Sequence, residues 1–210
     1  MSIHAHRASL GDVVAVRAGH PFRGSIEALC DGPVRAVQMK DLDPLDGIHW
    51  PGVVRTQLGG RRQADWLLDG DLLFVSRGTR FYAACVDAPP GAAVCGQHLF
   101  HLRVKRGSSL IPAFLAWQIN QPPFQRELRR SAEGSSQLSV RRPVLEALPI
   151  GIPSLDDQKR IVELAQLARR ERQLHQQLIR NRERLLESIA ETLSTACDTA
   201  QDKTSGSERQ

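Results

Sequence analysis

Cys95 and His98 are the two residues whose types and spacing could support nucleophilic chemistry. A thiol activated by an imidazole base is a common arrangement in covalent catalysis. On a strand, side chains three positions apart point to opposite faces, so these two groups would meet only if the chain turned at Gly96. An enzyme that uses Cys95 and His98 therefore stays an alternative, and it is tested by whether Cys95→Ser preserves function in vivo.

The other cysteines and histidines do not indicate metal binding. The cysteines are scattered without any CxxC pair, so neither a disulfide framework nor a zinc site follows. His98 and His101 are close in sequence, but no third ligand is evident. We expect no metal and no cofactor in this chain. The four cysteines are Cys30, Cys85, Cys95 and Cys197.

Excess positive charge is confined to the part of the chain before Ser154. Residues 1–153 contain 18 Lys and Arg against 13 Asp and Glu, whereas residues 154–210 contain ten of each. Sixteen of those 18 basic residues are Arg, the side chain suited to bidentate contact with phosphate or guanine. This distribution indicates an anionic partner, most simply nucleic acid.

A polar sequence follows the most apolar run of this basic part. Leu72 to Val75 is typical of a strand buried on both faces, and it ends abruptly at Ser76-Arg77-Gly78-Thr79-Arg80. Such a strand would hold a rigid polar tip against a ligand. The Gly-rich segment 43–65 also carries Arg and Gln side chains, and it is either a contact loop or a solvated connection.

Periodicity and turn signals predict one mixed α+β domain with short strands over residues 1–153. The start is loose and polar, and residues 131–137 read as a polar loop. A change of period near residue 111 predicts helices over 111–120 and 122–131, with a short helix or turn over 142–147. The predicted strands span 10–17, 34–39, 72–75, 81–86, 93–104 and 148–152.

A long helix is predicted over residues 154–197, because neither Gly nor Pro occurs between Leu155 and Ala196. Ser154 can cap its start, and Asp156 and Asp157 favour the positive end of the helix dipole. The tail 198–210 is small and polar and should be disordered.

The apolar stripe of this helix is too interrupted for a simple two-stranded coiled coil but broad enough for two neighbouring helices. We therefore expect it to pack in a coiled coil or bundle, although folding back onto its own domain is an alternative. The stripe residues expected to contact a second copy or another partner are Ile161, Leu164, Leu167, Leu174, Leu178, Leu185, Ile189 and Leu193.

The composition is ordinary for a globular protein, with 41% hydrophobic and 24% charged residues. Apolar runs are far shorter than the roughly 20 residues of a membrane span. The first ten residues lack the apolar core of a signal peptide. We expect a folded cytoplasmic protein without a membrane partner.

Seven sequence pieces occur in a recognisable order across nearly all of residues 9–197. They are LGDV, VQMKDLD, LLDGDLLFVSRG, AVCGQHLFHLRV, LIPAFLAWQIN, GSSQLSVRRPVLEALPIGIPSLDDQKRIV and the long charged helix. Together they resemble one half of a specificity (S) subunit of type I restriction-modification systems. The most specific pieces are GDLLFVSRG, the GSSQ loop and IPSLDDQ at the helix start. One difference is that Ala8-Ser9-Leu10 replaces the usual Trp before the first strand.

The resemblance implies a noncatalytic DNA-recognition subunit. Such subunits usually carry two target recognition domains and two long antiparallel helices, and they read the two parts of a split DNA sequence. They bind adenine methyltransferase subunits that use S-adenosylmethionine, and sometimes a motor nuclease subunit. This chain has one domain and one helix, so it resembles a half subunit that pairs with itself or with another half. A homodimer would favour a split palindrome.

The resemblance and the Arg-rich composition together place a DNA-contacting face on the domain. Arg and Gln can pair with guanine and adenine through two hydrogen bonds, whereas Arg141 and Arg142 would serve phosphates. The expected DNA-contacting residues are Arg55, Gln57, Arg61, Arg62, Arg77, Thr79, Arg80, Ser135, Ser136, Gln137 and Arg141. A second hypothesis is a stand-alone dimeric DNA-binding regulator of the same fold, without a methyltransferase partner.

Overall fold

The computed structural model describes residues 5–59, 63–132 and 138–205, with side chains described as far as residue 194. The chain divides into two compact units, Met1–Ala165 and Gln166–Gln210. The first unit holds every strand and the shorter helices of the described residues. The described residues of the second unit all belong to the long helix, which begins in the first unit at Leu155.

A four-stranded antiparallel sheet forms the centre of the first unit. Its order is β2 (Val14–Ala18), β10 (Leu99–Val104), β7 (Leu72–Val75) and β8 (Tyr82–Cys85). Side chains of β7 alternate between two apolar clusters, with Leu72 and Phe74 in one and Leu73 and Val75 in the other. This alternation explains why the apolar run is continuous, because both faces of the strand are covered.

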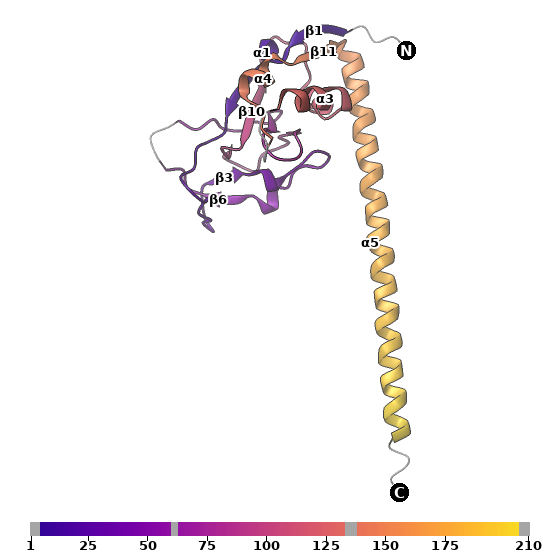
Figure 1. Cartoon of the computed structure of the whole chain (residues 1–210). Helices are drawn as coiled ribbons and strands as arrows, with labels where there is room; N and C mark the ends of the chain where they lie inside the picture. The colour runs from indigo at the N-terminus through magenta and orange to yellow at the C-terminus, as the bar shows by residue number, and fades with distance from the viewer. Residues whose placement is uncertain (1–4, 60–62, 133–137, 206–210) are drawn as a thin grey trace. The chain divides into compact units, whose positions relative to one another are not determined.

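The two faces of this sheet are covered by different layers. On one face lie the apolar side chains of α2 (Pro112–Ile119), α3 (Pro122–Ser131) and α4 (Arg142–Ala147). The other face packs against a three-stranded sheet of β6 (Val54–Thr56), β3 (Val34–Val37) and β9 (Ala93–Cys95). These helices confirm the three that the sequence predicts in this region, and the domain is of the predicted mixed α/β class (Figure 1).

Short elements connect β3 to β6. The 3-10 turn η1 (Met39–Asp41) follows β3 and leads into a hairpin of β4 (Leu42–Asp43) and β5 (Gly47–Ile48). A second 3-10 turn, η2 (Trp50–Gly52), precedes β6. The predicted irregular segment 43–65 therefore contains regular structure in its first half.

The start of the domain differs from its prediction as a loose segment. β1 (Ala5–Ser9) pairs antiparallel with β11 (Pro149–Pro153), so that Ala5 lies opposite Pro153 (Figure 1). Because its partner strand is about 144 residues away, the pairing of β1 leaves no local pattern in the sequence. The side chains of β1 are also only slightly buried. The predicted strand 10–17 is likewise wrong in its first half. Residues Leu10–Val13 form the helical turn α1, because the Asp12 carboxylate accepts the Ser9 N–H (3.2 Å).

The predicted strand 93–104 is two strands, β9 and β10, separated by a turn at Gly96. Gly96 packs so tightly on Gly19 that a Cβ atom at Gly19 would collide with the Gly96 carbonyl oxygen. The His20 N–H donates to the Cys95 carbonyl (2.7 Å), and the Gly96 N–H donates to the Val37 carbonyl (2.8 Å). The turn is thus fixed by two segments distant in sequence.

The long helix α5 spans Leu155–Ser205, which is about 75 Å of helix. Ser154 caps it as predicted, because its hydroxyl oxygen accepts the Asp157 N–H (3.2 Å). The predicted end at residue 197 and the disordered tail from 198 are wrong as far as Ser205. The reason is that neither Gly nor Pro occurs before Gly206. None of the helices among the described residues is both long and apolar enough to span a membrane.

Candidate nucleic-acid interface

The loop between β7 and β8, residues 76–81, carries three of the predicted contact residues. Arg77, Thr79 and Arg80 are all exposed. Gly78 has φ +113°, a conformation that favours glycine, so the loop turns sharply between Arg77 and Thr79. The buried β7 therefore ends in a polar tip, as predicted.

The segment Leu138–Val140 forms an antiparallel bridge with this loop, with Ser139 opposite Arg77. The Gly78 N–H donates to the Leu138 carbonyl (3.0 Å), and the Val140 N–H donates to the Ser76 carbonyl (2.9 Å). Arg141, which is exposed, follows directly at the start of α4. The structure thus brings two predicted groups together, although they are about 60 residues apart in sequence.

The register of the central sheet adds the β9–β10 turn, Gly96–His98, to the same end. Val75 pairs with Leu99 on one side and with Tyr82 on the other, so Ser76 and His98 are neighbours. The Ser76 hydroxyl donates to the His98 carbonyl (3.4 Å). Gln97 and His98 are exposed beside Arg77. Sequence reasoning missed both as contact residues, and the signal that could have found them is the turn at Gly96.

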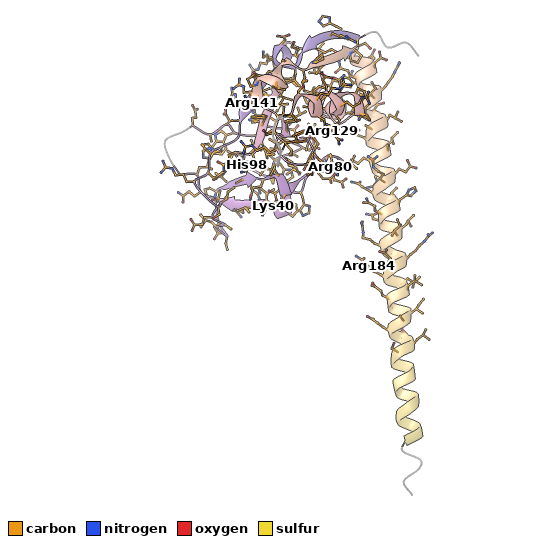
Figure 2. All side chains as sticks on the ribbon, viewed as in Figure 1. Lys40, Arg80, His98, Arg129, Arg141 and Arg184 are labelled. Carbon is orange, nitrogen blue, oxygen red and sulfur yellow. The ribbon has the colours of Figure 1, made fainter. Side chains whose placement is uncertain are left out.

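The end of β3 lies at this place as well. β3 runs parallel to β9, with Val37 opposite Cys95, so Gln38 and Lys40 follow β3 where the β9–β10 turn follows β9. Figure 2 labels Lys40, Arg80, His98 and Arg141, which come from four different segments. We call the residues gathered at this end the recognition edge. It comprises Gln38, Lys40, Arg77, Thr79, Arg80, Gln97, His98 and Arg141.

Arg55 and Gln57 lie elsewhere in the domain. Thr56 pairs with Val34, so Gln57 is at the opposite end of β3 from the recognition edge. The Arg55 Nε donates to the Gly32 carbonyl (2.9 Å), so part of its guanidinium holds a loop. The predicted contacts that lie outside the described residues are Arg61, Arg62, Ser135, Ser136 and Gln137.

A buried charge network fixes β7 against β10 at the end of these strands opposite the recognition edge. Asp71 accepts hydrogen bonds from Arg103 through both carboxylate oxygens (2.7 and 2.6 Å) and faces His101 Nε2 at 2.7 Å. It also accepts the Leu68 N–H (2.7 Å). Burial raises the pKa of Asp71, but the bonds from Arg103, His101 and Leu68 outweigh it and lower the pKa to about 2. The network ties the start of β7 to β10.

The alternative of a Cys95–His98 enzyme is not favoured by the geometry. The required turn at Gly96 exists, yet Cys95 is 2% exposed, and burial raises the pKa of its thiol to about 12. A thiol in that state is a poor nucleophile near neutral pH. Groups of three or more residues able to hold a metal ion do not occur among the described residues.

The residues of the predicted apolar stripe of α5 differ in their burial. Ile161 is half-buried and packs against the core of the domain. The other seven are between 44% and 69% exposed. Those exposed residues are Leu164, Leu167, Leu174, Leu178, Leu185, Ile189 and Leu193.

The family model for the type I restriction modification DNA specificity domain matches residues 54–181. The S subunit of a type I restriction-modification system from M. genitalium is similar, with 15% identity, a TM-score of 0.53, and coverage of 77% of this chain and 38% of that one. The HsdS subunit from Thermoanaerobacter tengcongensis is also similar, with 19% identity and a TM-score of 0.57. The match covers 80% of this chain and 38% of that one. No curated protein matches the chain.

A third solved chain, from a study of complex assembly and conformational transition of the type I R-M system, gives 18% identity and a TM-score of 0.58. It is covered over 38% of its length, and 80% of this chain is covered. At these identities the likeness concerns the fold alone. The chain spans 38% of the length of each of these three solved relatives.

The fold, a mixed α/β domain followed by a long helix, is that of the solved type I specificity subunits. The matching family model is that of a domain for DNA sequence specificity. The match to the family model covers more than half of the sequence. The chain therefore belongs to the type I restriction-modification DNA specificity domain family.

Proposed function

We propose that this chain is a noncatalytic subunit that directs a type I-like adenine-N6 methyltransferase to a split DNA target. The observation that carries the proposal is the recognition edge, where four segments of a family-typical domain present Arg, Gln, His and Lys side chains together. Arg and Gln read guanine and adenine edges, and the other cations favour phosphates.

The proposal includes a pairing of two half subunits through α5. One recognition domain reads one half-site, so a split target requires a second domain from another copy or from a different half. The exposed stripe leucines recur at spacings of three, four and seven residues, which suits helix packing. The breadth of the stripe leaves room for a methyltransferase subunit beside a second copy.

The implied partners are double-stranded DNA and a methyltransferase subunit that carries S-adenosylmethionine. A motor nuclease subunit would add restriction and phage defence to methylation. We place this assembly in the cytoplasm. The second candidate function is a stand-alone dimeric DNA-binding regulator, which the exposed α5 stripe also permits, because a dimer covers at least part of it.

Gentle purification of the tagged chain from its native host distinguishes these two functions. We expect an adenine methyltransferase to co-purify in fixed ratio, identified by mass spectrometry, with two copies of this chain in the complex. Genome-wide mapping of methylated adenines would then give the split target. A chain that is recovered alone as a dimer would support the regulator instead.

The double variant Arg77→Ala/Arg80→Ala is expected to weaken binding of the complex to its target DNA by about 100-fold, because each paired base contact contributes roughly 1–3 kcal/mol. Discrimination against single base changes should fall together with affinity. If the side chains bind phosphates instead, affinity for all sequences falls and the salt slope decreases by about 2. Fluorescence anisotropy at several salt concentrations measures both quantities.

The matched control is Arg170→Ala/Arg172→Ala, which removes the same charge from exposed positions of α5. It should leave sequence discrimination unchanged. Equal affinity, discrimination and salt dependence in the Arg77/Arg80 variant and the wild type would show that the β7–β8 loop does not contact DNA.

A further inference from the structure

A pocket of about 290 Å³ opens at the recognition edge, beside the β9–β10 turn. It lies between residues 22–26, η1 and that turn. The half-buried side chains of Phe22 and Met39 supply apolar surface. Its polar lining comes from Gln38, Lys40 and Gln97, together with His98.

Backbone contacts hold the β9–β10 turn to the end of β3 and to the residues that precede 22–26. The Gly19 N–H donates to the Leu99 carbonyl (3.0 Å), and the neighbouring His20 forms a bridge with Gly96. The Gly96 N–H donates to the Val37 carbonyl, which fixes η1 against the turn. The His20 and Phe22 rings also meet edge to face, with centroids 5.0 Å apart. The side of the hollow formed by Phe22, η1 and the turn is therefore held in place, as the walls of ligand pockets usually are.

The pocket differs in shape from the β7–β8 loop beside it. A projecting loop can enter a DNA groove and reach base edges, but a hollow can receive only a part of the nucleic acid that projects from the duplex. Two parts qualify: a backbone phosphate and a base rotated out of the stack. The apolar surface of Phe22 and Met39 disfavours a phosphate, which needs polar partners on every side.

We propose that this pocket receives one nucleobase extruded from the bound half-site. The inference rests on the proposed function, because it requires sequence-specific DNA at the recognition edge. Phe22 offers an aromatic surface for stacking, and the amides of Gln38 and Gln97 can bond the hydrogen-bonding edge of the base. Lys40 and His98 at the mouth neutralise the flanking phosphates.

The polar side chains at the mouth of the pocket are available for this role. Among the described residues, the side chains of Lys40, Gln97 and His98 make no hydrogen bond. The turn that carries two of them is joined to the β7–β8 loop through Ser76. A base could therefore enter the pocket while Arg77 contacts the neighbouring base pairs.

The test uses the complex purified as above and the target found by methylation mapping. An abasic nucleotide is placed opposite each base of the half-site in turn, which removes the pairing that extrusion must break. We expect the complex to bind at least about tenfold more tightly than to unmodified DNA when the abasic nucleotide lies opposite one particular base, and this base is not the methylated adenine. If that base is a purine, its replacement by 2-aminopurine should give a several-fold rise in fluorescence on binding.

Two variants assign the signal to the pocket. Phe22→Ala removes the stacking surface, and Gln97→Ala, at an exposed turn position, leaves the core untouched. In both variants, the gain in affinity caused by the abasic nucleotide should fall to less than threefold. The control Arg106→Ala, in an exposed loop, should keep the full gain. The inference is overturned if only the methylated adenine responds, or if Gln97→Ala keeps the full effect. A complex that binds DNA without sequence preference would overturn the proposed function as well.

Discussion

Asp71→Asn is expected to lower the free energy of unfolding of the recognition domain by about 3 kcal/mol. The substitution removes the buried negative charge that compensates the positive charge of Arg103. The His101 side chain is 2% exposed and that of Asp71 is 3% exposed, so water cannot replace the carboxylate. The melting temperature should fall by about 6–12 °C in a thermal unfolding measurement. The partly exposed guanidinium of Arg103 keeps the expected effect from being larger.

The pH dependence follows from the lowered pKa of Asp71. A carboxyl group whose folded pKa lies below its ordinary value stabilises the fold above that ordinary value, and the contribution is lost as the pH falls through the folded pKa. With the pKa near 2 in place of 3.8, the loss occurs between about pH 4 and pH 2. The wild type should lose about 2 kcal/mol in this range that Asp71→Asn does not.

Asp69→Asn is the matched control, because Asp69 lies in the same turn but is exposed. Within the described part of the chain, its side chain accepts only the Ala88 N–H (2.8 Å). It should shift the melting temperature by less than about 3 °C. If Asp71→Asn is as stable as this control, the network does not secure β7 against β10.

Gln158→Ala is expected to destabilise the domain by about 3 kcal/mol. Gln158 is fully buried, and its amide oxygen accepts the Ile111 N–H (2.8 Å) while its nitrogen donates to the Ser109 carbonyl (2.7 Å) and the Pro153 carbonyl (2.9 Å). Truncation leaves three backbone groups without partners away from water, and each such group costs roughly 1–3 kcal/mol. Chemical denaturation of the chain measures the change.

Gln158→Glu separates the hydrogen bonds from simple packing. Glutamate has nearly the same shape and can still accept from Ile111, but as a carboxylate it cannot donate to the two carbonyls. We expect it to be at least as destabilising as alanine. Gln176→Ala, at an exposed position of α5, should change stability by less than about 0.5 kcal/mol. A stable Gln158→Glu variant would contradict the bonding scheme.

Elements governed by local pattern were predictable from sequence. Leu72–Val75 is apolar at every position because two layers cover it, and α2 and α3 each begin at a proline that suits a first helical turn. β1 was not predictable, because its pairing with β11 depends on a distant strand. α1 was missed because it is a single turn of four residues, held by the bond from Ser9 N–H to Asp12 and by the bond from Leu10 N–H to the distant Leu148 carbonyl.

The candidate interface was predictable only in part for the same reason. Arg77 and Arg80 follow a strand that is legible in the sequence, so their position at its tip could be inferred. Gln97 and His98 reach the same place only because Val75 pairs with Leu99 and the chain turns at Gly96. The close packing of Gly19 against Gly96, which fixes that turn, is a contact between two small residues that are distant in sequence.

The pairing of β1 with β11 has a consequence for how this domain can be reused. Because Ala5 lies opposite Pro153, the polypeptide enters and leaves the recognition domain at almost the same point. A unit with adjacent ends can be duplicated in tandem or exchanged between chains as a cassette, since neighbouring segments need no rearrangement to accommodate it. The same geometry makes the domain a natural subject for circular permutation, with new ends placed in an exposed loop.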